Sequence, residues 1–385
     1  MKHLKIIFFI FSVLASGQLF SQTTIDFNEE NSGNLYIKLY GHVDYNHKIE
    51  SGVRHAGKMD VHRLVTLFGY QFSRKTQFVS EIEVEHVKEI FIEQAFVKHR
   101  ITRSINLKAG LLIVPMGFVN ESHEPTFFYS VERPLLDKNI IPSTWREIGL
   151  GISGLLQNHN LKYQLYLVNN PNGFDGEAKI NGAKGIRSAR QKGAESIVTG
   201  LPGISGQLEY YGFENMRIGW STYYGKTNTS LYDDFDVIDD FSTSVIDSST
   251  VTMHMNTLHF EYTSNKLTAR YQHTFSAFRH ADRYNQFTGS DVPELMHGFY
   301  TLVAYNVLNV ERQSLEPFFR YAHLNNHLNI PDGMDKKDEL KQNIYTIGVN
   351  YKPDPGVVLK VDFQFYERGN GSSFQQFNTG IGVWF

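Results

Sequence analysis

Acidic and basic side chains are mixed along the segment from Pro115 to Trp145, and such a mixture can act on dissolved ions. Its charged side chains are Glu121, Glu124, Glu132, Asp137, Arg133 and Lys138, which together give a balance of −2. Lys108 and Arg146, near the two ends of the segment, are candidates for an opposing basic wall. Carboxylates that face cations across a narrow aqueous space set up a transverse field, which biases the passage of ions. The alternative is that this long segment stays outside as a surface cover.

A second set of charges falls at alternate positions within runs that are otherwise apolar. We expect the basic members to point toward an aqueous interior, and they are Lys38, Lys108, Lys162, Arg217, Arg270, Arg320 and Lys360. The acidic members with the same expected direction are Asp44, Glu81, Glu83, Glu85, Glu209, Glu261, Glu316 and Asp362. Seven against eight gives no net preference for either sign of ion. A phosphate-selective passage needs a ladder of Arg or Lys, which is not visible here. These charges could instead form structural pairs across the wall.

Two further segments have a biased charge. Lys184, Arg187, Arg190 and Lys192 lie close together in the sequence with no acid among them, and they could attract anions or lipid phosphate groups. An acidic cluster could hold a divalent cation, and its members are Asp233, Asp234, Asp236, Asp239 and Asp240. Charge runs of both kinds are also typical of solvated loops.

Signatures of covalent catalysis are missing from the sequence. The chain has no nucleophile elbow, no HExxH zinc motif and no phosphate-cradling glycine loop. His323 and His327 have the spacing of zinc ligands on a helix, but they fall where a strand is expected to end, so we predict no metal there. We therefore expect neither an enzyme nor a cofactor. A catalytic site assembled from distant strands stays an alternative, because spacing alone does not exclude it.

The charged residues of the second set lie within short stretches that have apolar residues at every second position, and these stretches are the predicted strands that orient them. In residues 357–367, Leu359, Val361 and Phe363 fall on one face, while Lys360 and Asp362 fall on the other. Sixteen such stretches follow one another, at 34–44, 59–72, 76–86, 89–99, 105–113, 146–157, 161–169, 203–212, 216–225, 251–263, 266–277, 298–308, 313–323, 342–352, 357–367 and 375–385. Their connections alternate between short and long. This pattern predicts an all-β fold, a transmembrane antiparallel up-and-down β-barrel of sixteen strands, with the segment 115–145 folded inward. A large secreted soluble β-protein is the alternative.

The two ends of the chain indicate export and barrel assembly. Lys2 and Lys5 precede an apolar run and a small-residue exit, so residues 1–21 read as a signal peptide and 22–385 as one barrel domain. Cleavage could follow Gly17 or Ser21. The final strand places Ile381, Val383 and Phe385 on one face, and we expect the barrel insertion machinery to recognise this C-terminal pattern.

The composition fits this class of protein. Loss of the signal lysines takes the formal charge from −3 to −5, which disfavours nucleic acid as a partner. The chain has no Cys, so disulfides and thiol chemistry are excluded. Aromatic residues make up 14% of the chain, which suits a lipid-facing band and its interfacial girdles.

Several stretches carry a family resemblance. LEPFFRYAHLN at 315–325, YTIGVNYKPDPGVVLKVDFQ at 345–364 and the closing FNTGIGVWF are similar to the last strands of the phosphate-selective porin O and P family. Upstream, EQAFV at 93–97 and LKAGLLIVPMG at 107–117 resemble the strand of that family that leads into the pore loop. The resemblance implies an outer-membrane porin in a Gram-negative bacterium, assembled as a homotrimer. It is diffuse and structural, so it supports the architecture better than the solute.

These observations favour a channel for the passive diffusion of small hydrophilic solutes or ions, with phosphate and other anions among the candidates. The expected partners are outer-membrane lipid and the permeating solutes. The candidate pore-lining residues are Lys108, Glu121, Glu124, Glu132, Arg133, Asp137, Lys138, Arg146, Lys162, Arg217, Arg270, Arg320 and Lys360. Two alternatives from other classes stay open. One is a plugged barrel that binds a partner through its long loops, and the other is an outer-membrane barrel enzyme.

Overall fold

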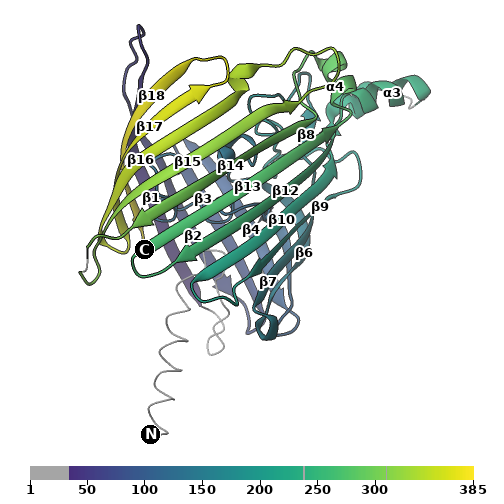
Figure 1. Ribbon diagram of the computed structural model, residues 1–385. Coiled ribbons are helices and arrows are strands. Elements are labelled where there is room, and N and C mark those ends of the chain that lie inside the picture. The colour runs from purple at the N-terminus through teal and green to yellow at the C-terminus, as the bar shows by residue number, and fades with distance from the viewer. Residues whose placement is uncertain (1–33, 237–238, 309) are drawn as a thin grey trace.

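The computed structural model describes residues 34–236, 239–308 and 310–385, so the predicted signal peptide lies outside the described residues. The described strands close into one antiparallel barrel of sixteen strands, as the sequence predicts (Figure 1). The barrel strands are β1 (Leu35–Ile49), β2 (Lys58–Gln71), β3 (Thr76–Glu85), β4 (Glu89–Arg100), β5 (Asn106–Ile113), β6 (Arg146–Leu156), β7 (Leu161–Val168), β9 (Gly203–Tyr210), β10 (Met216–Lys226), β12 (Thr252–Thr263), β13 (Leu267–Arg279), β14 (Leu295–Tyr305), β15 (Ser314–Asn329), β16 (Lys341–Asp354), β17 (Val357–Arg368) and β18 (Ser373–Trp384).

Each barrel strand pairs with its neighbour in the barrel, and β1 pairs with β18 to complete the ring. The last residue takes part in this closure. The N–H of Phe385 donates to the carbonyl of Leu39 at 2.9 Å, and the N–H of Leu39 donates back to the carbonyl of Phe385 at 2.8 Å. Closure leaves no unpaired edge among the sixteen described barrel strands, which is the condition for placing strands in lipid.

Short turns join the strands at one rim, and the longer connections lie at the other (Figure 1). The long connections carry the remaining elements, which are α2 (Leu136–Asn139), α3 (Asp240–Ser248), α4 (Ala281–Thr288), β8 (Asn172–Phe174), β11 (Asn228–Thr229), η3 (Ser230–Asp234) and η4 (Asp338–Leu340). A turn at the opposite rim holds η2 (Gln157–His159). Among the described residues, no helix is both long enough and apolar enough to cross a membrane.

Some strand ends differ from the expected positions. β1 continues to Ile49 instead of ending at 44, and β15 continues to Asn329 instead of ending at 323. Both extensions lie on the long-loop side, where apolar residues become fewer. Alternating hydrophobicity marks only the part of a strand that faces lipid, so it does not report where the pairing itself stops.

The side chains of β17 show how the wall is oriented. Val361 and Phe365 are 42% and 41% exposed on the outer face, whereas Lys360 and Asp362 on the inner face are 4% and 2% exposed. In this strand the charged side chains are buried and the apolar side chains are exposed at the surface. A soluble protein has the opposite distribution. The register predicted for this strand is confirmed.

The apolar core lies inside the barrel. Segment 114–145 contributes Met116, Leu136 and Trp145, which are buried against inward side chains such as Tyr166 and Tyr223. The rings of Trp145 and Tyr223 are 4.7 Å apart. The connections 169–202 and 280–294 add further apolar residues to the same cluster. Part of the lumen is thus filled by long connections that have folded inward.

Candidate functional site

Hydrogen bonds tie segment 114–145 to strands around the barrel. Its backbone N–H groups donate to the wall side chains, from Gly117 to Ser221 Oγ at 3.0 Å and from Phe118 to Gln272 Oε1 at 2.8 Å. On the other side of the segment, the N–H of Val131 donates to a carboxylate oxygen of β17 at 2.6 Å. Because β17 lies four strands from β13 and six strands from β10 in the ring of sixteen, the segment crosses the lumen.

Most inward wall charges are paired or covered by this segment. Lys162 contacts Glu209 at 3.1 Å, and Arg217 contacts Glu209 at 3.7 Å and Glu261 at 3.1 Å. Arg270 also pairs with Glu261. This arrangement matches the reading in which such charges form structural pairs across the wall.

Three more predicted wall cations are buried against neutral partners. Lys108 Nζ donates to the hydroxyl of Tyr166 at 2.9 Å. Lys360 donates to the carbonyls of Phe128 and Ser130, the second at 3.1 Å. Arg320 donates to the hydroxyl of Ser130, and it also borders a cavity of about 270 Å³. These cations point inward as expected; Lys360 and Arg320 hold segment 114–145 in place, whereas Lys108 bonds to β7 of the wall.

The four predicted carboxylates of segment 114–145 differ in burial and in their neighbours. Glu121 is 6% exposed and accepts from Gln164 at 2.6 Å, and Glu124 is 7% exposed. Asp137 is fully buried and accepts from Gln272 at 2.8 Å, and its burial raises the pKa of the carboxyl to about 7. Glu132 alone among the four lines a described cavity. The expectation that all four face the permeating ion is therefore wrong for Glu121, Glu124 and Asp137, because these side chains are buried, and those of Glu121 and Asp137 are hydrogen-bonded to wall side chains.

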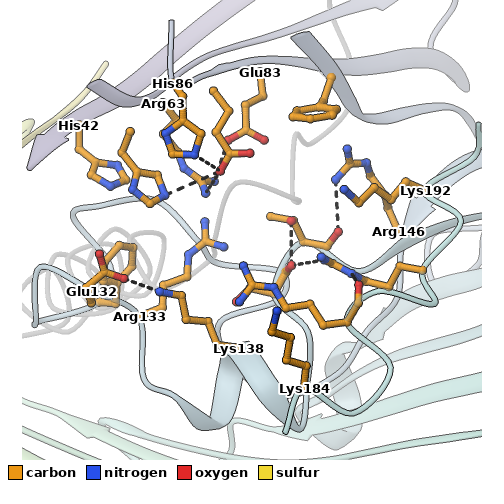
Figure 2. A pocket seen from close by; sticks show the side chains of 18 of the residues that line it. His42, Arg63, Glu83, His86, Glu132, Arg133, Lys138, Arg146, Lys184 and Lys192 are labelled. Carbon is orange, nitrogen blue, oxygen red and sulfur yellow. Dashed lines mark hydrogen bonds and ion pairs between the residues drawn. The ribbon is translucent and has the colours of Figure 1, made fainter. Parts of the chain in front are cut away.

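One of the spaces that remain is a cavity of about 740 Å³ beside the segment (Figure 2). The predicted residues Glu132, Arg133, Lys138 and Arg146 all line it. Its other charged or histidine lining residues are Arg63, Lys184, Arg187, Arg190, Lys192, Glu83, Glu85, His42, His62 and His86. The lining of this cavity therefore contains eight basic residues, three acidic residues and three histidines.

The basic side of the cavity comes from two connections that fold toward each other. Arg190 Nη1 donates to the carbonyl of Ser143 at 2.5 Å, which joins segment 169–202 to segment 114–145. Arg146 and Lys192 lie over the ring of Phe91 at 5.7 Å and 5.1 Å. Burial lowers the pKa of Lys192, and the charges of Arg190 and Arg146 lower it further. Cations that already repel one another favour an anion between them.

The other side of the cavity carries histidines and carboxylates on the first strands. In Figure 2, His42, His86 and Glu83 lie across the cavity from Lys184 and Lys192. Glu132 contacts Lys138 at 2.6 Å and accepts from the amide of Asn46 at 3.1 Å. Burial alone would raise the pKa of Glu132, but Lys138 outweighs it and the pKa stays below its ordinary value. The side of the cavity on the first strands thus mixes histidines and carboxylates with Arg63, which lies 3.2 Å from Glu83, whereas the cluster at 184–192 is basic throughout.

Two β-bulges deliver side chains that alternation does not predict. His42 pairs with Arg63 and Val43 pairs with Val61, so His62 is an extra residue in β2. In the same way, Glu81 pairs with Gln94 and Ile82 pairs with Ile92, which leaves Glu93 extra in β4. A bulge turns two consecutive side chains toward one face. No signal in the sequence marks these positions.

The remaining candidates lie elsewhere. His327 is buried beside Asp291 at 3.7 Å, and among the described residues neither His323 nor His327 belongs to a group of three metal ligands. The acidic cluster lies on η3 and α3 at the long-loop rim, where Asp239 caps α3. Ile381 and Phe385 are 52% and 74% exposed on the outer face. Their role in assembly stays a prediction.

No family model matches the sequence. A protein of Aquifex aeolicus (strain VF5), described as an uncharacterized protein, is 30% identical over 334 residues, which are 79% of this chain and 70% of that protein. Three solved structures are similar in fold. An anion-selective porin from Comamonas acidovorans is 12% identical, with 91% of this chain and 100% of that chain covered and a TM-score of 0.58. OmpF of Salmonella typhi in complex with daunomycin is 11% identical, with 92% of this chain and 98% of that chain covered and a TM-score of 0.59. OmpT of Vibrio cholerae in its trimer form is 9% identical, with 92% of this chain and 100% of that chain covered and a TM-score of 0.54. At these identities the likeness concerns the fold alone.

Proposed function

The chain belongs to one family with the Aquifex aeolicus protein and has the fold of outer-membrane porins, and we propose that it forms a water-filled channel for small hydrophilic solutes with a preference for anions. The observation that carries this proposal is the cavity of about 740 Å³, which eight Lys and Arg residues and three Glu residues line. Cations gathered at a constriction replace part of the hydration shell of an anion.

The inverted distribution of polarity supports the membrane part of the proposal. Outer-face residues such as Leu359, Val361 and Ile381 are 38–52% exposed and apolar, which suits contact with lipid. The signal peptide proposed at residues 1–21 would export the chain, and the outer membrane of a Gram-negative bacterium would be its destination. Assembly as a homotrimer is part of the same proposal, and the trimer form of a protein with this fold supports it.

Phosphate is one candidate among the anions. Clustered guanidinium and ammonium groups suit phosphate, sulfate and carboxylates alike, because each has several acceptor oxygens. The resemblance to the phosphate-selective porin O and P family favours phosphate. We therefore propose oxyanions as the solute class and test phosphate as its first member.

Single-channel recording in a planar bilayer tests the proposal. Protein folded in detergent should give discrete conductance steps, and a salt gradient should give a reversal potential of the sign that anion preference requires. Millimolar phosphate should reduce the chloride current by competing for the cationic lining. A protein that inserts but passes no current would favour the plugged, partner-binding barrel. A reversal potential of the opposite sign would overturn the anion preference.

A shortened loop tests the role of segment 114–145. Replacement of residues 118–142 by a short polar turn removes the filling between the wall strands, so the conductance should rise and ion preference should weaken. Deletion within the connection 330–340, whose residues line none of the described cavities, is the control. Equal conductance in the shortened protein and the wild type would remove this segment from the constriction.

A further inference from the structure

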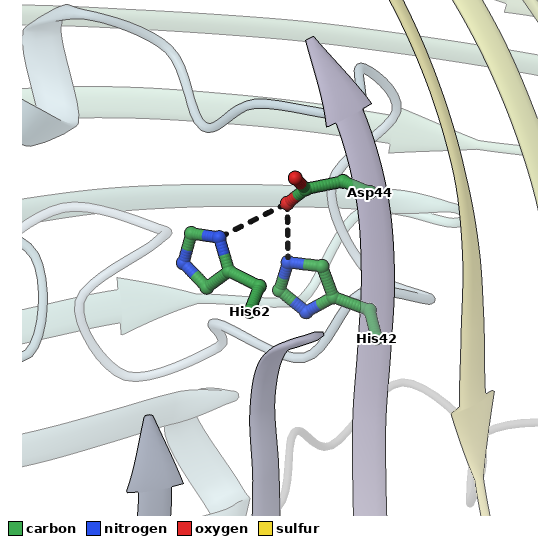
Figure 3. A group of neighbouring side chains, drawn as sticks. All are labelled: His42, Asp44 and His62. Carbon is green, nitrogen blue, oxygen red and sulfur yellow. Dashed lines mark hydrogen bonds and ion pairs between the residues drawn. The ribbon is translucent and has the colours of Figure 1, made fainter. Parts of the chain in front are cut away.

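Two histidines and one carboxylate converge on the inner face of the β1–β2 hairpin (Figure 3). Asp44 Oδ2 lies 3.0 Å from His62 Nδ1 and 3.6 Å from His42 Nε2. One nitrogen or oxygen from each of the three residues lies within 4.8 Å of the others. Ligands about 2.1 Å from a tetrahedral zinc ion are separated by roughly 3.4 Å, so two of the three separations already fit.

The bulge in β2 makes this convergence possible. His42 and Asp44 share the inner face of β1 because they are two residues apart. A regular β2 would point Arg63 inward and His62 outward, but His62 is the extra residue of the bulge and reaches Asp44. Bulges occur preferentially where a side chain must be re-aimed at a functional site.

The hydrogen-bonding needs of the buried ligands are incompletely met. Asp44 is 3% exposed and His42 is 8% exposed, and their neighbour His62 stacks on the His42 ring at 4.4 Å. Among the described residues, Nδ1 of His42 is buried without a hydrogen-bond partner. One oxygen of Asp44 faces both imidazoles at once. The shared position lies at Nε2 of His42 and not at Nδ1: Nε2 is 3.6 Å from Asp44 Oδ2, too far for a hydrogen bond, and a bound ion would hold all three groups together.

Neighbouring polar groups hold the ligands in orientation. The amide of Asn46 donates to the second oxygen of Asp44 at 3.1 Å, which leaves Oδ2 for the shared position. Glu85 lies 3.8 Å from Nε2 of His62, on the ring edge away from Asp44. Metal-binding histidines commonly have such a carboxylate near the far nitrogen, where it fixes the ring and its tautomer.

An ion can reach the group from the lumen. His42 and His62 line the cavity of about 740 Å³, and Asp44 and His62 line a neighbouring cavity of about 630 Å³. The other described group of three possible ligands, Glu81, Glu93 and His123, is sealed and fully buried. There Arg63 Nη1 already lies 4.0 Å from Glu93, so a cation occupies that neighbourhood.

We propose that His42, Asp44 and His62 form a binding site for a divalent first-row transition-metal ion such as Zn²⁺, with water completing the coordination. Two imidazoles and one carboxylate suit such ions, whereas Mg²⁺ and Ca²⁺ prefer oxygen ligands throughout. The site goes beyond the proposed channel, and it would place two positive charges at the edge of the cavity.

Zinc titration of the detergent-folded protein, without a histidine tag, tests the site by calorimetry. The wild type should bind one Zn²⁺ per chain in the presence of millimolar Mg²⁺. Asp44→Asn, and His42→Ala combined with His62→Ala, should each weaken the binding by about ten-fold or more. His47→Ala is the matched control, because His47 lies on the opposite face of β1 and should leave the affinity unchanged. Heat-modifiable migration on gels shows that each variant is folded.

Equal zinc affinity in the wild type and in folded Asp44→Asn would overturn the site, as would the absence of saturable binding by the folded wild type. This result is independent of the channel, because the titration needs no current. A wild type that binds zinc but passes no current in metal-free buffer would contradict the proposed function and leave the metal site intact.

Discussion

Neutralising two cations that line the cavity should weaken its preference for anions, and the size of the effect can be worked out from the radius of the cavity. Lys184 and Arg187 are exposed lining residues, so Lys184→Gln with Arg187→Gln removes charge without disturbing a buried contact. A sphere of the cavity volume, about 740 Å³, has a radius of about 6 Å. At that distance one charge in water attracts a monovalent anion by about 0.7 kcal/mol before screening.

Salt sets how much of this attraction survives. With a Debye length of about 30 Å at 0.01 M salt and about 10 Å at 0.1 M, the two charges together contribute about 1.1 and about 0.8 kcal/mol. The double variant should therefore hold about seven-fold fewer anions in the cavity at 0.01 M and about four-fold fewer at 0.1 M.

Reversal potentials across a salt gradient give the measurement, repeated at both salt concentrations. Arg283→Gln with Lys336→Gln is the matched control, because these residues lie on α4 and the connection 330–340 and line none of the described cavities. An unchanged reversal potential in the double variant would refute the placement of these cations beside the ion path. A shift that does not shrink with salt would refute its electrostatic origin.

Other expected outcomes follow from the same contacts. Arg at Val361, on the outer face, should destabilise the folded barrel by about 2 to 4 kcal/mol if it lies near the bilayer midplane, whereas Arg at the inward Gln376 should be tolerated in the same urea titration. Deletion of Phe385 removes both hydrogen bonds to β1 and should lower the heat-modifiable fraction recovered from outer membranes; normal recovery would contradict this. Glu132→Gln should move the reversal potential toward anions, and no movement would place this carboxylate off the ion path. Burial raises the pKa of Asp137 to about 7, above its ordinary 3.8, so the folded protein holds a proton that the unfolded chain releases. Stability in urea should therefore fall as pH rises from 4 to 7, and Asp137→Asn should flatten that slope.

Period-two alternation was sufficient to predict the wall, because lipid imposes one polarity on every outward residue. It therefore placed Lys360 inward and Val361 outward correctly. Alternation indicates the direction of a side chain and not whether other groups cover it, and inward-pointing Gln364 is an example. The side chain of Gln364 is 1% exposed and donates to Asp362, so an Arg at this inward position would displace a buried contact.

The cavity was less predictable than the wall, for two physical reasons. The bulge that turns His62 inward interrupts the period-two alternation of β2, and it has no signature in residue type. The basic run at 184–192 is equally compatible with a solvated loop, because a charge run does not indicate where its backbone packs. Buried apolar neighbours such as Ile186 and Ala189 draw that connection into the lumen.

The lining of the cavity comes from separate stretches of sequence, since β1, β2 and the ends of β3 and β4 face connections 114–145 and 169–202 across one space. The ion selectivity of the proposed channel therefore depends on several strands and both connections together, and not on one loop. A chimera that received only segment 114–145 from a relative would keep the old histidines and the old arginines opposite the new graft. We expect such exchanges to give intermediate permeability, and a complete transfer should require both connections and the first four strands together.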